Sequence, residues 1–131
     1  MIAIDTNVLI RFFVADDESQ AETVRELVES CRERNEPILV TNPVLCETEW
    51  VLEGVYRATR KEIASVVQEL LNTDTFVFEN KRAVEHALGQ YRARKAEFSD
   101  YLIGSSGFER GAKTTFTFDR GLRSAENFSL L

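Results

Sequence analysis

The strongest constraint on the fold is the regular alternation of short apolar runs with longer helical patterns. The apolar runs lie at residues 2–5, 37–41, 75–79 and 114–118, and residues 127–131 fit a last short one. Between them, apolar residues recur at helical spacing. Strands separated by helices favour a mostly parallel sheet covered on both faces. We therefore expect an α/β fold, a three-layer α/β/α sandwich around a central, mostly parallel sheet.

Chain length and composition favour a single domain, residues 1–131. The chain has 44% hydrophobic residues, only two prolines and six glycines, and no linker or internal repeat. No apolar run approaches the roughly 20 residues that span a bilayer, and the first residues do not resemble a signal peptide. We expect a cytoplasmic protein with no membrane segment, in which Cys31 and Cys46 are ordinary thiols.

Charge limits the function without defining it. The net charge of −6 argues against broad, nonspecific nucleic-acid binding, which uses basic patches. It does not exclude an enzyme that acts on nucleic acid, because divalent cations can mask carboxylates and local basic clusters can contact phosphates.

Polar residues ahead of the helical patterns predict where helices begin. Pro43 at a first helical position and Glu62 three residues after a threonine strengthen two of these assignments. Gly111 is expected to end the helix that starts at Asp100. The expected capping residues are Thr6, Asn42, Thr59 and Ser99.

Four carboxylates fall where strands end or helices begin. Asp5 ends the first strand, and Glu47 lies about one turn into the helix after the second. Asp100 opens a helix, and Asp119 follows the run at 114–118. Active sites of open parallel sheets lie beyond the carboxyl ends of the strands, so the predicted fold can bring these acids to one rim.

Such a cluster makes chemical sense with a cation. Four carboxylates in one cleft repel, and without a cation at least one would bind a proton. Mg²⁺ or Mn²⁺ suits these hard oxygen ligands, and a metal pair about 3.5–4 Å apart can activate water against a phosphodiester. Thr6 and Asn7, beside Asp5, can orient a carboxylate or a bound water.

Each acid also has a simpler interpretation. Asp5 fits a helix N-cap, Asp100 an acid that stabilises a helix dipole, and Asp119 a turn residue. Glu47 has a neighbour, Glu49, that fits a solvent-facing position, although the apolar surroundings place Glu47 near a buried face. The joint placement of the four acids carries the hypothesis.

Four segments resemble one family of nucleases. They are "IAIDTNVLIRFF", "NPVLCETEWVL", "AEFSDYLIG" and "TFTFDRGL", and they span essentially the whole chain. In order and spacing, they are similar to PIN-domain ribonucleases, and most closely to VapC-type toxins of toxin–antitoxin pairs.

The resemblance implies Mg²⁺-dependent endonucleolytic cleavage of RNA, with Mn²⁺ as a possible substitute. Asp5 and Asp100 are then the expected direct metal ligands, and Thr6 and Thr117 resemble the family's hydroxyl residues beside the acids. Many relatives carry Asp where this chain has Glu97, which is therefore auxiliary. The acidic cluster that the resemblance implies comprises Asp5, Glu47, Asp100 and Asp119.

The resemblance also implies a homodimer and a cognate antitoxin that covers the acidic cleft. Opposite charge would speed the encounter of an acidic protein with a basic partner segment. Phe12, Phe13 and Trp50 fit either an antitoxin groove or the core, and we expect core for Phe13 and Trp50.

Basic side chains near the acids are candidates for contacts with RNA phosphates. Three of them precede the Asp100 helix, where a solvated helix end is an equally good interpretation. The candidates are Arg11, Arg92, Arg94, Lys95 and Arg120.

Other functions fit the sequence less well. Haloacid-dehalogenase-like phosphatases need a second aspartate where this chain has Asn7, and receiver domains need an aspartate where it has Glu79. The single histidine, His86, is expected to be a surface or partly buried helical residue. The remaining alternative is a non-catalytic PIN-like module that binds RNA or a protein partner.

Overall fold

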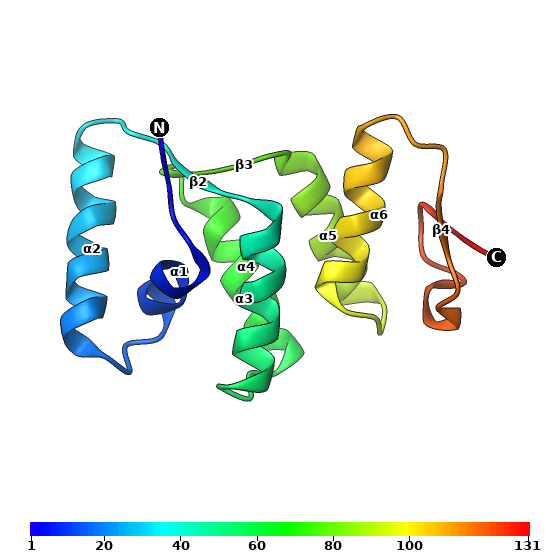
Figure 1. Cartoon of the computed structure of the whole chain (residues 1–131), viewed down its shortest axis with the longest axis horizontal. Coiled ribbons are helices and arrows are strands. Elements are labelled where there is room, and N and C mark those ends of the chain that lie inside the picture. Colours follow the sequence, from blue (N-terminus) through cyan, green and yellow to red (C-terminus); the bar gives the residue numbers. More distant parts are fainter. The chain divides into compact units, whose positions relative to one another are not determined.

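Helices and parallel strands alternate along the chain, as Figure 1 shows. The computed structural model describes all residues, 1–131. Every strand pair is parallel, which confirms the predicted α/β fold class. The elements are β1 (Ile2–Ala3), α1 (Thr6–Phe13), α2 (Glu18–Glu33), β2 (Ile38–Val40), α3 (Asn42–Gly54), α4 (Arg60–Asn72), β3 (Phe76–Phe78), α5 (Lys81–Ala93), α6 (Phe98–Glu109), β4 (Thr115–Thr117), the 3₁₀ helix η1 (Arg120–Leu122) and β5 (Phe128–Leu130).

The chain forms two compact units, residues 1–79 and 80–131, which we call the N-terminal and C-terminal units. The first holds a three-stranded sheet in the order β1-β2-β3, and the second a two-stranded sheet, β4-β5. The composition of the sequence gives no sign of this division, and a single domain over residues 1–131 stays a prediction. No helix is long and apolar enough to cross a membrane.

The N-terminal unit is built around its central strand. β2 pairs with β1 through Ile38 and Ile2 and with β3 through Ile38 and Phe76. Ile38 and Val40 are fully buried, as expected for a strand with covered faces. Helix α1 packs against α2 and α3, and its Leu9 is fully buried.

The C-terminal unit is built on the packing of α5 along α6. The rings of Tyr91 and Phe98 meet edge to face with their centroids 6.1 Å apart. His86 lies half-buried on α5, as the sequence predicts, with hydrogen-bond contacts to Ser105 of α6 and Glu126 ahead of β5. These contacts hold the segment before β5 against the helix pair.

Three of the predicted helix starts are wrong by one or two residues. Asp5 caps α1, so Thr6 is its first helical residue instead of its cap. Asn42 is likewise the first residue of α3, after an extended Thr41. Helix α6 begins at Phe98 after Glu97, so Ser99 lies inside the first turn, where it is buried. The capping box at the start of α4 is confirmed.

Helix α3 turns a different face inward from the one expected. Its buried residues include Leu45, Glu49 and Leu52, so Glu49 is buried whereas Glu47 is exposed. Trp50 lies on the other side of the helix with 53% of its surface exposed, so the expectation that it is core is wrong. Phe13, half-buried, meets the ring of Phe12 edge to face.

Candidate functional site

The end of β1 and helix α3 are joined through a buried hydroxyl. Thr6 is buried, and its Oγ1 donates to Oε2 of Glu47 at 2.8 Å. Asp5 is exposed, and its Oδ1 accepts a hydrogen bond from the backbone N of Val8 at 3.0 Å. Asn7 is exposed on the first turn of α1. The structure thus brings Thr6 and Glu47 together and fixes the Asp5 carboxylate at a helix N-terminus, where a negative charge is stabilised.

Glu79 is a further acid at the carboxyl end of a strand, which the sequence analysis did not assign to the site. It directly follows β3, and its Oε2 accepts from the backbone N of Asn42 at 2.5 Å. This contact holds the start of α3, the helix that carries Glu47. An acid placed directly after a buried strand is the same signal that identified Asp5, and it could have identified Glu79.

The C-terminal unit holds the second pair of predicted acids. Asp100 lies in the first turn of α6, where its Oδ2 accepts from the backbone N of Glu97 at 3.2 Å. Burial is the main cause that raises the pKa of Asp100. The negative charges of Glu97 and Asp119 raise it further, whereas the hydrogen bond from the Glu97 backbone opposes the rise. Asp100 and Asp119 therefore interact electrostatically in the absence of any cation.

Asp119 is held by a tight turn after β4. Its backbone N donates to Oγ1 of Thr117 at 3.0 Å, and its Oδ1 accepts from the backbone N of Gly121 at 2.8 Å. The turn interpretation of Asp119 is therefore correct as a description of its backbone. It leaves the second carboxylate oxygen, Oδ2, without a hydrogen bond from the turn.

The predicted ligands are divided two and two between the units. Within neither unit do three or more His, Cys, Asp or Glu side chains gather in a way that could hold a metal ion. The donor set nevertheless fits Mg²⁺ or Mn²⁺, because it consists of carboxylate and hydroxyl oxygens.

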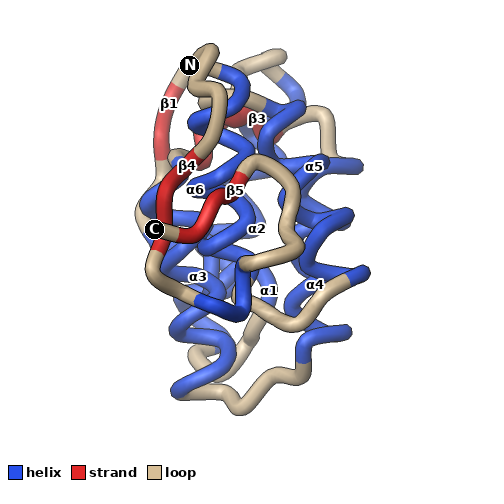
Figure 2. The backbone as a smooth tube through the Cα atoms, turned by 90° about the vertical axis from the view of Figure 1, so that its right-hand side faces the viewer, coloured by secondary structure: helices blue, strands red, loops and turns tan.

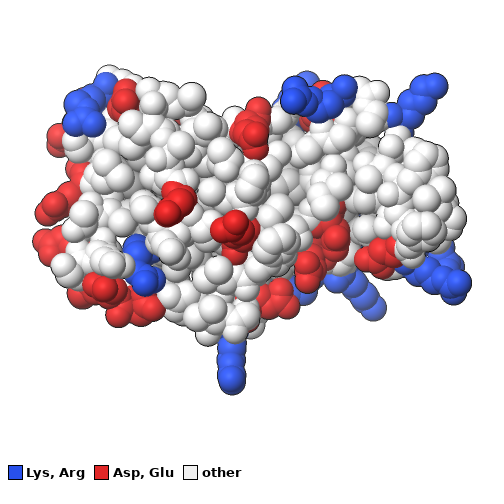
Figure 3. All heavy atoms as spheres, in the orientation of Figure 1, with Lys and Arg blue, Asp and Glu red and all other residues white.

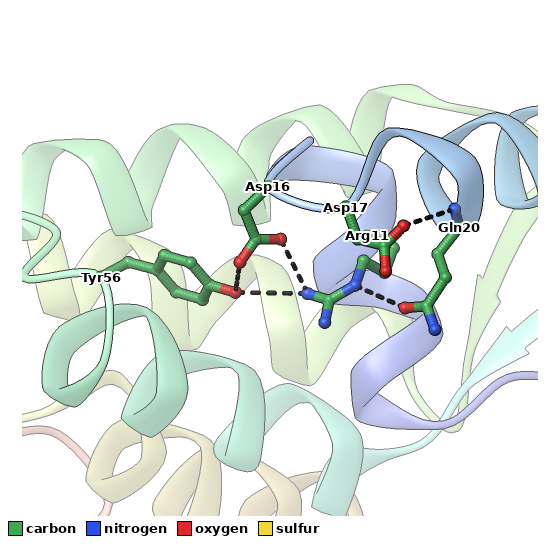
Figure 4. Close-up of polar contacts among 5 residues, drawn as sticks. All are labelled: Arg11, Asp16, Asp17, Gln20 and Tyr56. Carbon is green, nitrogen blue, oxygen red and sulfur yellow. Dashed lines mark hydrogen bonds and ion pairs between the residues drawn. The ribbon is translucent and has the colours of Figure 1, made fainter.

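Arg11, a predicted RNA contact, lies in a network inside the N-terminal unit (Figure 4). Its Nη1 donates to Asp16 Oδ1 at 3.0 Å and to the Tyr56 hydroxyl at 3.2 Å. Its Nε donates to Gln20 at 2.8 Å, and the Tyr56 hydroxyl donates to the other Asp16 oxygen. The network joins α1, α2 and the residues after α3, so these Arg11 donors already have protein partners.

The other basic candidates lie in the C-terminal unit. Arg94 is half-buried and donates to Gln90 at 2.9 Å and to Ser124 at 3.2 Å. Arg92, Lys95 and Arg120 are exposed. Their contact with RNA stays a prediction.

Two sequence comparisons relate the chain to known proteins. The family model for the PIN domain matches residues 2–127, a range that spans both units and all four acids. The chain is also 30% identical to a VapC ribonuclease of Aquifex aeolicus (strain VF5) over 120 residues, which is 92% of this chain and 88% of that protein. The chain therefore belongs to the PIN domain family.

Proposed function

We propose that this protein is a divalent-metal-dependent endoribonuclease that acts in the cytoplasm as the toxin of a type II toxin–antitoxin pair. The observation that carries the proposal is the match of the PIN domain over residues 2–127, which includes all four predicted acids. The similarity to a VapC ribonuclease over 92% of the chain supports RNA as the substrate.

In this proposal, Asp5, Glu47, Asp100 and Asp119 form the acidic cluster. Asp5 and Asp100 would bind the metal directly, and Glu47 and Asp119 would complete the site. A bound Mg²⁺ would supply Lewis-acid polarisation of the phosphodiester and would lower the pKa of water.

The remaining residues orient the acids. Thr6 fixes one oxygen of Glu47, and Glu79 anchors the helix that carries it. Thr117 and Gly121 hold the backbone and one oxygen of Asp119. Glu97 and Asn7 are auxiliary. Each lies beside one of the four acids, and neither is assigned a role of its own.

We further propose a homodimer and a cognate antitoxin with a basic segment that covers the acids. The similarity to a VapC ribonuclease and the net charge of −6 support such a partner. Trp50, exposed on α3, is a candidate contact for the antitoxin. Light scattering of the purified chain tests the dimer, and co-purification with the product of the adjacent gene tests the antitoxin.

The central experiment measures RNA cleavage in Mg²⁺ by Asp5→Asn and Asp100→Asn. Each substitution keeps the shape and removes the charge, and we expect a loss of about a thousandfold, the scale of several kcal/mol of electrostatic stabilisation. Glu53→Gln is the matched control, because Glu53 is an exposed acid on α3 outside the proposed cluster. Wild-type cleavage rates in both aspartate variants would exclude the proposal.

A non-catalytic PIN-like module that only binds RNA or a protein is the alternative. Calorimetry with Mn²⁺ separates the two functions, because the nuclease requires metal binding that depends on Asp5 and Asp100. A wild-type chain that binds no Mn²⁺ and cuts no RNA would establish the alternative.

A further inference from the structure

β4 and the bend that follows it, just before Asp119, expose two aromatic rings that the proposed chemistry does not use. Phe116 is the middle residue of β4, and Phe118 lies in the bend directly after the strand. Phe116 has 62% of its surface exposed and Phe118 has 81%. Large aromatic side chains are usually buried, so two strongly exposed ones only two residues apart in the chain indicate a surface that binds something.

The opposite face of this sheet is the one that packs on the protein. Thr115 pairs with Phe128 of β5, and the Phe128 ring lies so close to Gly104 of α6 that any side chain at this glycine would overlap it. Figure 2 shows β4 and β5 side by side nearest the viewer with α6 behind them. The face of β4 that carries Phe116 therefore points away from α6.

Positive charge flanks the two rings. Lys113 precedes β4, and Arg120 and Arg123 follow it, all exposed. None of the three forms an ion pair with a carboxylate. Figure 3 shows uncharged atoms over this end of the C-terminal unit, with Lys and Arg side chains above and below them. An apolar surface between cations fits a ligand that has flat apolar parts and regularly spaced negative charges.

We propose that Phe116 and Phe118 form a platform on which bases of single-stranded RNA stack, directly beside Asp119. The inference rests on the proposed ribonuclease function and deepens it by assigning where the substrate's bases lie. Aromatic side chains stack on any base, and neighbouring Lys and Arg bind the phosphates.

The form of RNA that fits follows from how bases become available for stacking. Bases in loops and unpaired segments can be splayed out and stacked on aromatic side chains, whereas paired bases are already stacked within a helix. We therefore expect the platform to bind unpaired RNA.

The experiment measures binding of a short single-stranded oligoribonucleotide by fluorescence anisotropy. Asp5→Asn serves as the background so that the RNA stays intact. We expect Phe118→Ala to raise the Kd about tenfold, within the range known for loss of one stacked base. Phe118→Tyr should keep the affinity, because it keeps the ring, whereas Phe118→Leu should behave like Phe118→Ala.

Two controls test the stacking contact itself. An oligomer of the same length that lacks bases should bind Phe118→Ala and its parent equally, because only phosphate contacts remain. Phe108→Ala removes a ring that is 56% exposed on α6, and it should leave the Kd unchanged. An equal loss in Phe108→Ala, or full affinity in Phe118→Leu, would overturn the platform.

The same variants show whether RNA or a second copy of the chain binds the surface of Phe116 and Phe118. They also test the platform separately from the proposed ribonuclease function on which it rests. If Phe118→Ala dissociates an oligomer in light scattering and leaves RNA affinity unchanged, the face is an interface between copies and the platform is wrong. A wild-type chain that neither binds nor cuts RNA overturns the proposed function. A chain that cuts RNA and tolerates Phe118→Ala overturns the platform alone.

Discussion

The two units stabilise their acids in different ways. In the N-terminal unit, the Asp5 and Glu47 carboxylates accept hydrogen bonds from a backbone amide and a buried hydroxyl. In the C-terminal unit, Asp100 and Asp119 also accept backbone hydrogen bonds, but Asp100 is partly buried and its charged neighbours are the acids Glu97 and Asp119. Burial and neighbouring negative charges disfavour the ionised carboxylate. We expect a bound cation to offset this repulsion around Asp100.

The largest expected effect concerns metal binding. Mn²⁺ at a hundred times its Kd should stabilise the wild-type chain by about 2.7 kcal/mol, seen as a higher Tm. Asp100→Asn should lose most of this stabilisation, because it removes the charge of a proposed metal ligand. Glu53→Gln should keep it. Equal stabilisation of Asp100→Asn and wild type by Mn²⁺ would contradict the assignment of Asp100 as a metal ligand.

A second prediction tests how far packing, instead of hydrogen bonding, holds the C-terminal unit. Gly104→Ala should lower the free energy of unfolding by about 1–3 kcal/mol, because the new methyl group overlaps the ring of Phe128. Gly89→Ala on α5 is the matched control, since nothing lies within 4 Å of a methyl group there. Urea unfolding measures both, and the control should be neutral or slightly stabilised, because alanine favours helix. If Gly104→Ala and wild type unfold at the same urea concentration, β5 can move away from the new methyl group without a measurable loss of stability.

A third prediction concerns the hydrogen bond of the N-terminal unit. Thr6→Val keeps the buried shape but leaves Glu47 without its donor, and it should lower RNA cleavage by about tenfold, as loss of a contact that orients a ligand does. Thr6→Ser should restore most of the rate. If Thr6→Val cleaves RNA as fast as wild type, the hydroxyl is a packing feature only.

The smallest effect is the pH dependence of stability without metal. The pKa of Asp100 is raised in the folded chain, above an unfolded value of about 3.9. The folded state therefore binds this proton more tightly, and the contribution is fully present below about pH 4 and lost as pH rises through the folded pKa. Asp100→Asn lacks this loss, so the stability of the variant relative to wild type should increase between pH 4 and 7.

Urea unfolding in a chelator at several pH values measures that difference. A stability difference that stays constant with pH would mean that neither burial nor the charges of Glu97 and Asp119 raise the pKa of Asp100. The corresponding variant of the N-terminal unit, Asp5→Asn, provides the comparison.

The helices and strands were predictable because each combines a periodic pattern of apolar residues with residues that mark its ends. The exact first residue of each helix was not predictable, because the residue that caps the helix is the one whose backbone is extended. Asp5, with ψ of 178°, is extended and caps α1, whereas Thr6 is already helical. Two polar residues in succession give the same sequence signal, and only the backbone distinguishes them.

The site was predictable where strand ends define it and less so along a helix. The rule that acids follow strands pointed to Asp5 and Asp119, and the same rule applies to Glu79. On α3 the direction of each side chain depends on which face packs inward. The buried positions Leu45, Glu49 and Leu52 follow a helical period, and this period is the sequence signal that marks Glu49 as buried.

The Arg11 network has a consequence for how this family member can vary. One guanidinium joins α1, the residues before α2, α2 itself and the turn after α3. A change in the length of the α1–α2 connection would move Asp16 relative to Arg11 and Tyr56, and so disturb the hydrogen bonds of Asp16 to both. Natural variants should therefore keep this connection constant in length, or replace Arg11, Asp16 and Tyr56 together.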